Sequence, residues 1–267
     1  MSLTNYQKKA WNELENIRIV KNSGGGNTVA IYFSSNNLYY PDTEDCFVKT
    51  IYEKDRYEWT RMMIKRASKH IFVRDVYKTW YVTGINSSTS SIPLLLERLK
   101  KEVKGYDEIV TVGSSAGGFA ASYFGSCLNA DIVFNFNGQW EINSVIERNG
   151  YSSLKKLHES CGDFFDIVKY IRNSQNIFYF ISEKSRWDMA QEKYSQILPL
   201  NRIFFSTSHH GIPFLKVALP YVLNMDKKHL SDFSDRHFNP FIFTVKCVGL
   251  HKALNGLYKQ FKEKYLK

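Results

Sequence analysis

The stretch that decides the fold is "DEIVTVGSSAGGFAASYFG", residues 107 to 125. An apolar run over 108 to 113 is interrupted by glycine and serine, and a segment of small residues follows from 116 onward. A short apolar run bounded by such a break predicts a buried strand, and the Ala-rich segment predicts a helix that packs closely against it. The turn between them fits G-x-S-x-G in the strand–turn–helix setting that a nucleophile elbow requires.

The centre of this pattern is Ser115, which we predict to be a nucleophile. In an elbow the serine has an unfavourable backbone conformation, so the residues two before and two after it must lack bulk. Here these residues are Gly113 and Gly117. The helix start directs amide N–H groups and a positive dipole at the site, which predicts the N–H of Ala116 as an oxyanion donor. The alternative is a structural or phosphate-binding turn, but neither a dinucleotide fingerprint nor a P-loop is present.

A serine nucleophile needs a base. After the apolar run 202–207 comes "SHHGIPF", with His209 and His210 directly beyond a predicted strand. Gly211 allows the loop to turn tightly after the second histidine, so we predict His210 as the base and keep His209 as the alternative.

The base in turn needs a group that fixes its tautomer. After the apolar run 176–182 comes "EKSRWD", which places Asp188 on the following loop or at the start of the next helix. We predict Asp188 as this group, with Glu183 at the strand end as the alternative. An aspartate in this position is equally typical of a plain helix N-cap.

The second oxyanion donor is expected in the loop after the strand 28–33. This loop is "SSNN", and Ser34 or Ser35 could supply the amide, with Ser35 as our prediction. The Gly-rich oxyanion loop of familiar esterases is not present in the sequence.

Four aromatic residues near predicted strand ends have two interpretations. They could form a platform for a sugar or an acyl chain, or they could simply belong to the core. These residues are Trp80, Tyr81, Trp140 and Trp187.

Apolar runs and amphipathic segments alternate along the chain. The predicted strands are 28–33, 70–75, 108–113, 131–137, 176–182 and 202–207, and the predicted helices are 92–103, 116–128, 188–197 and 213–224. This alternation predicts an α/β fold, a three-layer α/β/α sandwich with a mostly parallel central sheet. We expect one domain over 1–267, with a helical insertion at 138–175 and a C-terminal helical extension at 225–267.

With Ser115, Asp188 and His210 in this order, the chain resembles the α/β-hydrolase superfamily over residues 27 to 224. The segment "FVRDVYKTWYVTGI" (72 to 85), followed by an amphipathic helix and the elbow, is also similar to hydrolase-like proteins of bacterial surface polysaccharide biosynthesis. The resemblance implies a serine esterase or O-acyltransferase with a Ser-His-Asp triad, acting on a small-molecule or saccharide ester. The alternative is an inactive hydrolase-fold protein that binds a glycan or a protein partner.

Composition limits the partners. The 36 Lys and Arg outnumber the 26 Asp and Glu, which favours anionic partners, but no nucleic-acid-binding signature is present and we predict no nucleic acid. The basic segment 252–267 leaves contact with a membrane surface or a polyanion open. Four dispersed cysteines indicate neither disulfides nor a metal site, and we predict no cofactor. Without an apolar leader segment, we expect a cytoplasmic protein, while its oligomeric state stays open.

Overall fold

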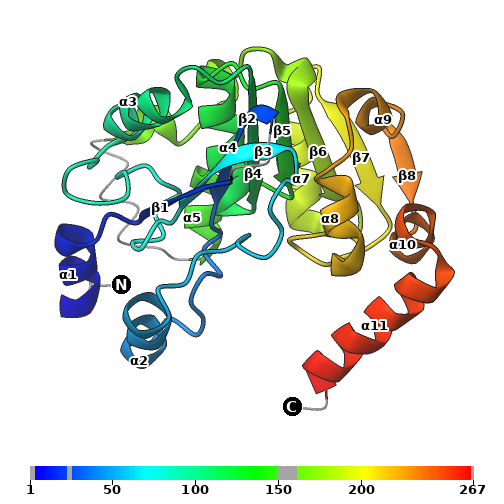
Figure 1. The fold of residues 1–267 in the computed structure, drawn as a ribbon, viewed down its shortest axis with the longest axis horizontal. Coiled ribbons are helices and arrows are strands. Elements are labelled where there is room, and N and C mark those ends of the chain that lie inside the picture. The colour runs from blue at the N-terminus through cyan, green and yellow to red at the C-terminus, as the bar shows by residue number, and fades with distance from the viewer. Residues whose placement is uncertain (1–3, 23–25, 150–160, 266–267) are drawn as a thin grey trace.

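The structure, a computed structural model, describes residues 4–22, 26–149 and 161–265 (Figure 1). An eight-stranded sheet forms its centre, in the order β1-β3-β2-β4-β5-β6-β7-β8. Every neighbouring pair is parallel except β1 and β3. The strands are β1 Ile17–Lys21, β2 Gly26–Phe33, β3 Ala67–Val73, β4 Glu108–Ser114, β5 Ile132–Phe136, β6 Ile177–Ser182, β7 Asn201–Phe205 and β8 Arg236–Phe238.

Helices cover both faces of this sheet (Figure 1). Because side chains alternate along a strand, Ile31 and Phe33 face one cluster while Tyr32 faces the other. The first cluster also contains residues of α3 and α4, and the second contains residues of α8, α9 and α10. The helices are α1 Asn5–Glu13, α2 Glu44–Phe47, α3 Ile92–Val103, α4 Ala116–Cys127, α5 Asn143–Asn149, α7 Arg186–Tyr194, α8 Leu219–Val222, α9 Lys227–Ser231, α10 Pro240–Val248 and α11 Leu250–Tyr265.

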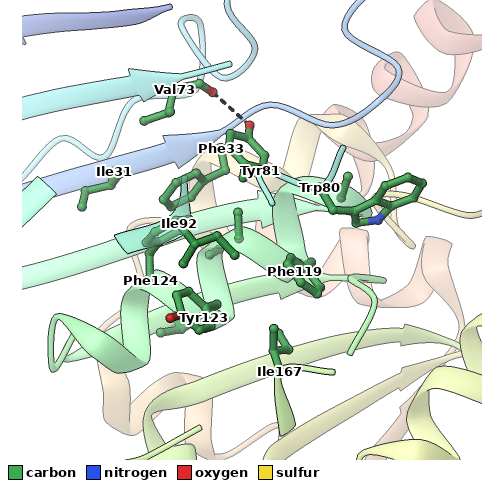
Figure 2. Close-up of a cluster of buried hydrophobic side chains, with 14 of the residues drawn as sticks. Ile31, Phe33, Val73, Trp80, Tyr81, Ile92, Phe119, Tyr123, Phe124 and Ile167 are labelled. Atoms are coloured by element: carbon green, nitrogen blue, oxygen red, sulfur yellow. Dashed lines mark hydrogen bonds between the residues drawn. The ribbon is translucent and has the colours of Figure 1, made fainter. Parts of the chain in front are cut away.

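The predicted three-layer α/β/α architecture is therefore confirmed. Figure 2 shows the first cluster, in which Phe33 of β2 lies among aromatic side chains. Its ring stacks on Phe124 of α4 at a centroid distance of 5.4 Å and meets Tyr81 edge-on at 5.4 Å. Such pairs add to the free energy gained by burial and hold α4 in a defined position on the sheet.

The order of the strands reverses at β2. The chain passes from β2 to β3 on one side and then returns to β4 on the other side. The carboxyl ends of β2 and β4 thus flank a topological switch point, where ligands bind in open α/β sheets. The predicted nucleophile follows β4, and the predicted second oxyanion donor follows β2.

Two strands were not expected from the sequence. Strand β1 lies at the sheet edge with mostly half-buried residues, and β8 is three residues long, so neither shows a clear apolar pattern. The predicted C-terminal helical extension at 225–267 contains α9, α10 and α11, and it also adds β8 to the sheet. Within 138–175 the structure places α5 and two 3₁₀ turns, and a third turn begins at Ser174. Residues 150–160 lie outside the described part, so the insertion stays a prediction.

The predicted helix 213–224 is broken. A 3₁₀ turn over Lys216–Ala218 leads into the single turn of α8, which begins at Leu219 and has Pro220 as its second residue. The ring of Pro220 cannot donate a backbone hydrogen bond, so it fits the first turn of a helix and not its middle.

Helices α10 and α11 are separated by Gly249, whose φ is 82°. Figure 1 shows α11 following α10 and extending away from the sheet. Among the described residues, no helix is long and apolar enough to cross a membrane.

Candidate active site

Ser115 lies on a strained turn between β4 and α4. Its φ of 54° and ψ of −123° fall in a region that non-glycine residues rarely occupy. A Cβ on Gly113 would lie 1.9 Å from the carbonyl oxygen of Gly117, and a Cβ on Gly117 would lie 2.3 Å from the carbonyl oxygen of Phe33. The strand and the helix therefore approach so closely that only glycine fits at both positions, as the elbow pattern predicted.

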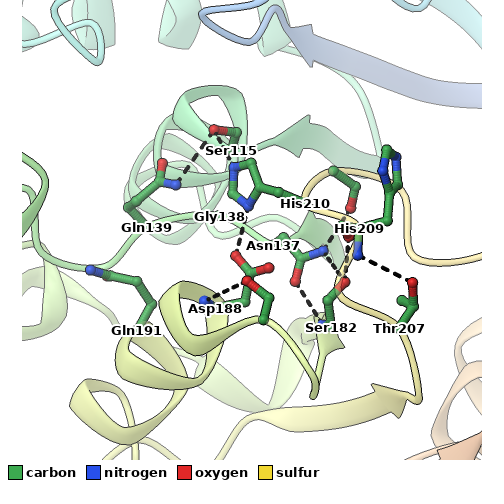
Figure 3. Close-up of polar contacts among 12 residues, drawn as sticks. Ser115, Asn137, Gly138, Gln139, Ser182, Asp188, Gln191, Thr207, His209 and His210 are labelled. Atoms are coloured by element: carbon green, nitrogen blue, oxygen red, sulfur yellow. Dashed lines mark hydrogen bonds and ion pairs between the residues drawn. The ribbon is translucent and has the colours of Figure 1, made fainter. Parts of the chain in front are cut away.

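Three predicted side chains meet at the carboxyl edge of the sheet (Figure 3). The Nε2 atom of His210 is 2.9 Å from the Oγ of Ser115, and its Nδ1 is 2.7 Å from Oδ1 of Asp188. These residues come from the loops and helices that follow β4, β6 and β7. The distances are those of hydrogen bonds, and the three groups form one continuous chain.

The partners of His210 determine its tautomer. An ionised carboxylate can only accept, so the proton of the neutral imidazole lies on Nδ1, and Nε2 accepts the hydroxyl proton of Ser115. Asp188 is 2% exposed, and its Oδ2 has no hydrogen-bond partner within the described residues. If His210 takes up the hydroxyl proton, the resulting cation lies next to this buried carboxylate, so the arrangement can move a proton from serine to histidine.

Asp188 is the third residue of α7 and not its N-cap. Ser185 caps the helix, and its Oγ accepts from the amide of Asp188 at 3.3 Å. The carboxylate therefore sits in the first turn, where the helix dipole favours a negative charge.

The carboxylate of Glu183 contacts another histidine, and the ring of His209 is turned away from Ser115 (Figure 3). The carboxylate of Glu183 lies 2.5 Å from Nδ1 of His237. His209 is linked through its backbone, which donates from its amide to Thr207 Oγ1 at 3.2 Å and accepts from Ser182 Oγ at 2.6 Å.

The loop that carries His210 is anchored on both sides. The side-chain amide of Asn137 donates to the carbonyl oxygen of Gly211 and to Ser182 Oγ, each at 2.8 Å. Ser182 in turn donates to the carbonyl oxygen of His209. Sequence reasoning missed both anchors, although each is a polar residue at the end of a predicted apolar strand.

Gln139 is a further neighbour of the serine that the sequence did not indicate. Its Nε2 lies 3.4 Å from Ser115 Oγ, and its Oε1 accepts from the indole N–H of Trp80 at 3.0 Å. An indole N–H can only donate, so the amide oxygen of Gln139 faces Trp80 and the amide NH₂ group faces Ser115.

Trp80 is buried, which places it in the core instead of an exposed aromatic platform. Tyr81 and Trp140 are buried as well, and Trp187 is exposed.

The oxyanion side of the site is arranged differently. Ala116 is the first residue of α4, so its amide has no acceptor within the helix. The amide of Ser35 donates to Oε2 of Glu58 at 2.7 Å, and its hydroxyl donates to Oε1 at 3.1 Å. The amide of Ser34 donates to the carbonyl oxygen of Val73. Ser35 can bind an oxyanion only if Glu58 gives way, so its assignment stays a prediction.

Glu58 is a carboxyl group in an unfavourable place for a charge. Burial raises the pKa of Glu58, although the hydrogen bonds from Ser35 and the charges of Arg56 and Lys216 act in the opposite direction. The group therefore accepts a proton more readily than an exposed glutamate.

Ser115 and His210 line a cavity of about 620 Å³. Apolar side chains and polar groups both contribute to its wall. The apolar residues are Trp59, Met62, Ile212 and Leu219, and polar residues include Asn36, Asn37, Glu58 and Lys216. The cavity can hold a small apolar group next to Ser115 together with a polar partner. The described residues contain no group of three or more His, Cys, Asp or Glu that could hold a metal ion.

The sequence matches no protein-family model and no curated protein. Among solved structures, it is similar to the capsule O-acetyltransferase of Neisseria meningitidis serogroup A, with 13% identity, a TM-score of 0.51 and coverage of 72% of this chain and 84% of that chain. A histidine-to-alanine variant of that enzyme in complex with CoA gives 13% identity, a TM-score of 0.50 and coverage of 72% and 83%. MPT51 (FbpC1) of Mycobacterium tuberculosis gives 11% identity, a TM-score of 0.50 and coverage of 82% and 93%. At these identities the likeness concerns the fold, which is that of the α/β-hydrolases.

Proposed function

We propose that this α/β-hydrolase-fold protein is a serine esterase or O-acyltransferase. Ser115 attacks the ester carbonyl while His210 takes its proton, and Asp188 stabilises the imidazolium that forms. The amide of Ala116 donates to the oxyanion. When the tetrahedral intermediate collapses, His210 returns the proton to the leaving alcohol and an acyl-enzyme remains. Water then completes hydrolysis, or an acceptor hydroxyl completes acyl transfer.

One observation carries this proposal: the hydrogen-bonded chain from Ser115 through His210 to Asp188 starts on a strained elbow. Backbone strain persists only where the surrounding structure enforces it, and such strain is concentrated at functional sites. An inactive binding protein has no need to keep the serine in this conformation.

In our proposal Gln139 positions the hydroxyl of Ser115. The amide NH₂ can only donate, so it engages a lone pair of Oγ and directs the single hydroxyl proton toward His210. The same contact stabilises negative charge on Oγ as the proton leaves. The Ser35 amide serves as a second oxyanion donor once Glu58 releases it.

For the substrate, we propose a short acyl group on a saccharide hydroxyl. Trp59, Met62 and Ile212 offer an apolar wall for the acyl group, while Asn36 and Asn37 offer hydrogen bonds to hydroxyl groups. The similar structures support this choice, since one is a capsule O-acetyltransferase and its variant was captured with CoA. An acyl-CoA is therefore the acyl donor to try first.

Labelling with a fluorophosphonate tests the nucleophile. We expect wild type to form an adduct at Ser115 and Ser115→Ala to form none. The matched control is Ser114→Ala, which removes the neighbouring cavity-lining hydroxyl and is expected to label like wild type. If folded wild type stays unlabelled under conditions that label an esterase, the enzymatic proposal fails and the binding-protein alternative takes its place.

A second assay separates hydrolysis from transfer. Wild type and Ser115→Ala are incubated with p-nitrophenyl acetate or acetyl-CoA, with and without an oligosaccharide acceptor. Release of acetate alone identifies an esterase, and an acetylated saccharide identifies an acyltransferase. If turnover is equal in the two proteins, Ser115 is not the nucleophile.

A further inference from the structure

Helix α11 has one face on the protein and other faces in solvent. Ala253 and Gly256 are buried, and a Cβ on Gly256 would lie 2.5 Å from the side chain of Val217. These residues fix one sector of the helix against the body of the protein. The rest of α11 extends beyond the sheet (Figure 1).

A second sector of α11 is apolar, and we call it the apolar stripe: Leu250, Leu254, Leu257 and Tyr258. Their spacing places them on one face of a helix. Each is between 46% and 63% exposed. Exposed apolar residues are common singly, but a contiguous row of large ones marks an interaction surface.

A third sector of α11, next to the stripe, is basic. It carries Lys252, Lys259 and Lys262, all of them exposed. A helix with one apolar face and one lysine-rich face is typical of a segment that lies in the interface of a bilayer, with the apolar face toward the acyl chains.

A cavity of about 590 Å³ continues this surface at the base of α11. Lys65, Lys246 and Lys252 line it, and none of the three forms an ion pair within the described chain. The carboxylate of Asp226, which also lines the cavity, lies 2.8 Å from Nδ1 of His229.

The wall of this cavity is otherwise largely apolar and includes Val217, Met225 and Phe233. A site whose ammonium groups form no ion pair among the described residues, next to an apolar wall, suits an amphiphile with a negatively charged head. Because Lys252 belongs both to this cavity and to the basic sector, the two features form one continuous surface.

We propose that α11 and the adjoining cavity dock the protein on an anionic phospholipid bilayer. The apolar stripe enters the boundary between headgroups and acyl chains, and the lysines contact phosphate groups. A second copy of the chain is the less favourable occupant, because its lysines and its net charge of +10 would meet the same charges here. This inference does not depend on the proposed enzymatic function.

Vesicle cosedimentation tests the proposal. The protein is mixed with vesicles of phosphatidylcholine alone or of phosphatidylcholine with phosphatidylglycerol. We expect binding to the anionic vesicles only, weakened by salt as the charges are screened. Removing three lysines in Lys252→Gln/Lys259→Gln/Lys262→Gln is expected to weaken binding on the order of 100-fold, at about fivefold per lysine. Leu254→Ser/Leu257→Ser is expected to weaken it at least about tenfold.

Matched controls come from other exposed positions. Lys101→Gln/Lys104→Gln removes exposed lysines near the end of α3, and Ile197→Ser removes an apolar side chain that is 80% exposed. Both are expected to bind like wild type, and circular dichroism confirms that each variant is folded. The proposal is overturned if wild type binds neither vesicle at low salt, binds both equally, or loses binding equally in the controls. A dimer in light scattering that Leu254→Ser/Leu257→Ser dissociates would assign the stripe to a second copy instead.

Discussion

The two sides of Ser115 are held in different ways. On the histidine side, Asn137 and Ser182 fasten the backbone before and after His210, so the ring meets the serine at 2.9 Å. On the oxyanion side, the amide of Ser35 is bound to the carboxylate of Glu58. In the proposed mechanism, the groups for proton transfer are thus already in contact, whereas the predicted second oxyanion donor, the amide of Ser35, is bound to a group that a substrate would have to displace.

The difference shows which part of the site is preorganised. Hydrogen bonds that are in place before the reaction cost no reorganisation when charge develops. A carboxylate that occupies a donor amide has the opposite effect, since its bond must break before the amide can act. Substitutions on the histidine side should therefore nearly abolish catalysis, whereas substitutions on the oxyanion side should change kcat/KM only a few-fold.

The largest effect is expected from His210→Ala. Loss of the base should lower kcat by about 10⁴-fold or more, because the serine hydroxyl then has no proton acceptor. His209→Ala is the matched control, since His209 takes part in the loop anchoring through its backbone. Ester hydrolysis by both variants measures the contrast. An equal loss in the two variants would mean that the loop as a whole, and not the His210 ring, is required.

Asp188→Asn is expected to lower kcat by about 10³- to 10⁴-fold. An asparagine that turns its NH₂ group toward His210 favours the tautomer with the proton on Nε2, where it cannot accept from serine. Glu183→Gln, which alters the contact with His237, should retain activity within a few-fold. If Glu183→Gln is the weaker enzyme of the two, the acid has been assigned to the wrong residue.

Local sequence patterns predicted the histidine side. The elbow depends on five consecutive residues, and the central parallel strands have apolar runs that bring their carboxyl ends to one edge. Residues that directly follow these runs, such as Asp188 and His210, are therefore placed near Ser115 by topology alone. The sequence did not predict the edge strands β1 and β8, because a half-buried strand or a strand of three residues shows no clear periodicity of apolar residues.

The remaining neighbours depend on contacts that no local pattern encodes. Glu58 meets Ser35 across 23 residues and Gln139 meets Trp80 across 59. A single signal was available for Gln139, since it follows the predicted strand 131–137 at the same edge as the other site residues. Trp80 gave no such signal, because an aromatic side chain in the core and one at a binding site look alike in sequence.

Gln139 contacts the hydroxyl of Ser115 itself, and its removal should have an intermediate effect. Gln139→Leu is expected to slow fluorophosphonate labelling and acylation about tenfold, the size of one hydrogen bond to a group that gains charge, with KM nearly unchanged. Trp80→Phe, which removes the indole N–H but keeps an aromatic ring, should act in the same direction more weakly.

The isosteric variant Gln139→Glu separates positioning from packing. A carboxylate cannot donate to Ser115, but a protonated carboxyl can, so the relative rate of this variant should recover as pH falls. A loss that is the same at every pH would show that Gln139 only fills space.

The smallest effect is expected from Glu58→Gln. A neutral amide holds the Ser35 N–H less strongly than a carboxylate does, so kcat/KM should rise by a few-fold, in contrast to every change on the histidine side. The exposed Glu53→Gln is the control and should leave kcat/KM unchanged. A fall in kcat/KM would mean that Glu58 itself helps to bind the substrate.

Thermal stability checks the same residue by its pH dependence. Burial raises the pKa of Glu58 in the folded protein, so the folded state keeps this proton to a higher pH than the unfolded chain. Wild type therefore loses stability relative to Glu58→Gln as pH rises from the ordinary glutamate pKa of about 4.3 through the raised value. Below that pH range, wild type and Glu58→Gln should have the same melting temperature. Near neutral pH the melting temperature of the variant should be higher by no more than about 2–4 °C. If the difference in melting temperature between the two proteins does not change with pH, it arises from packing, and titration of Glu58 does not contribute to it.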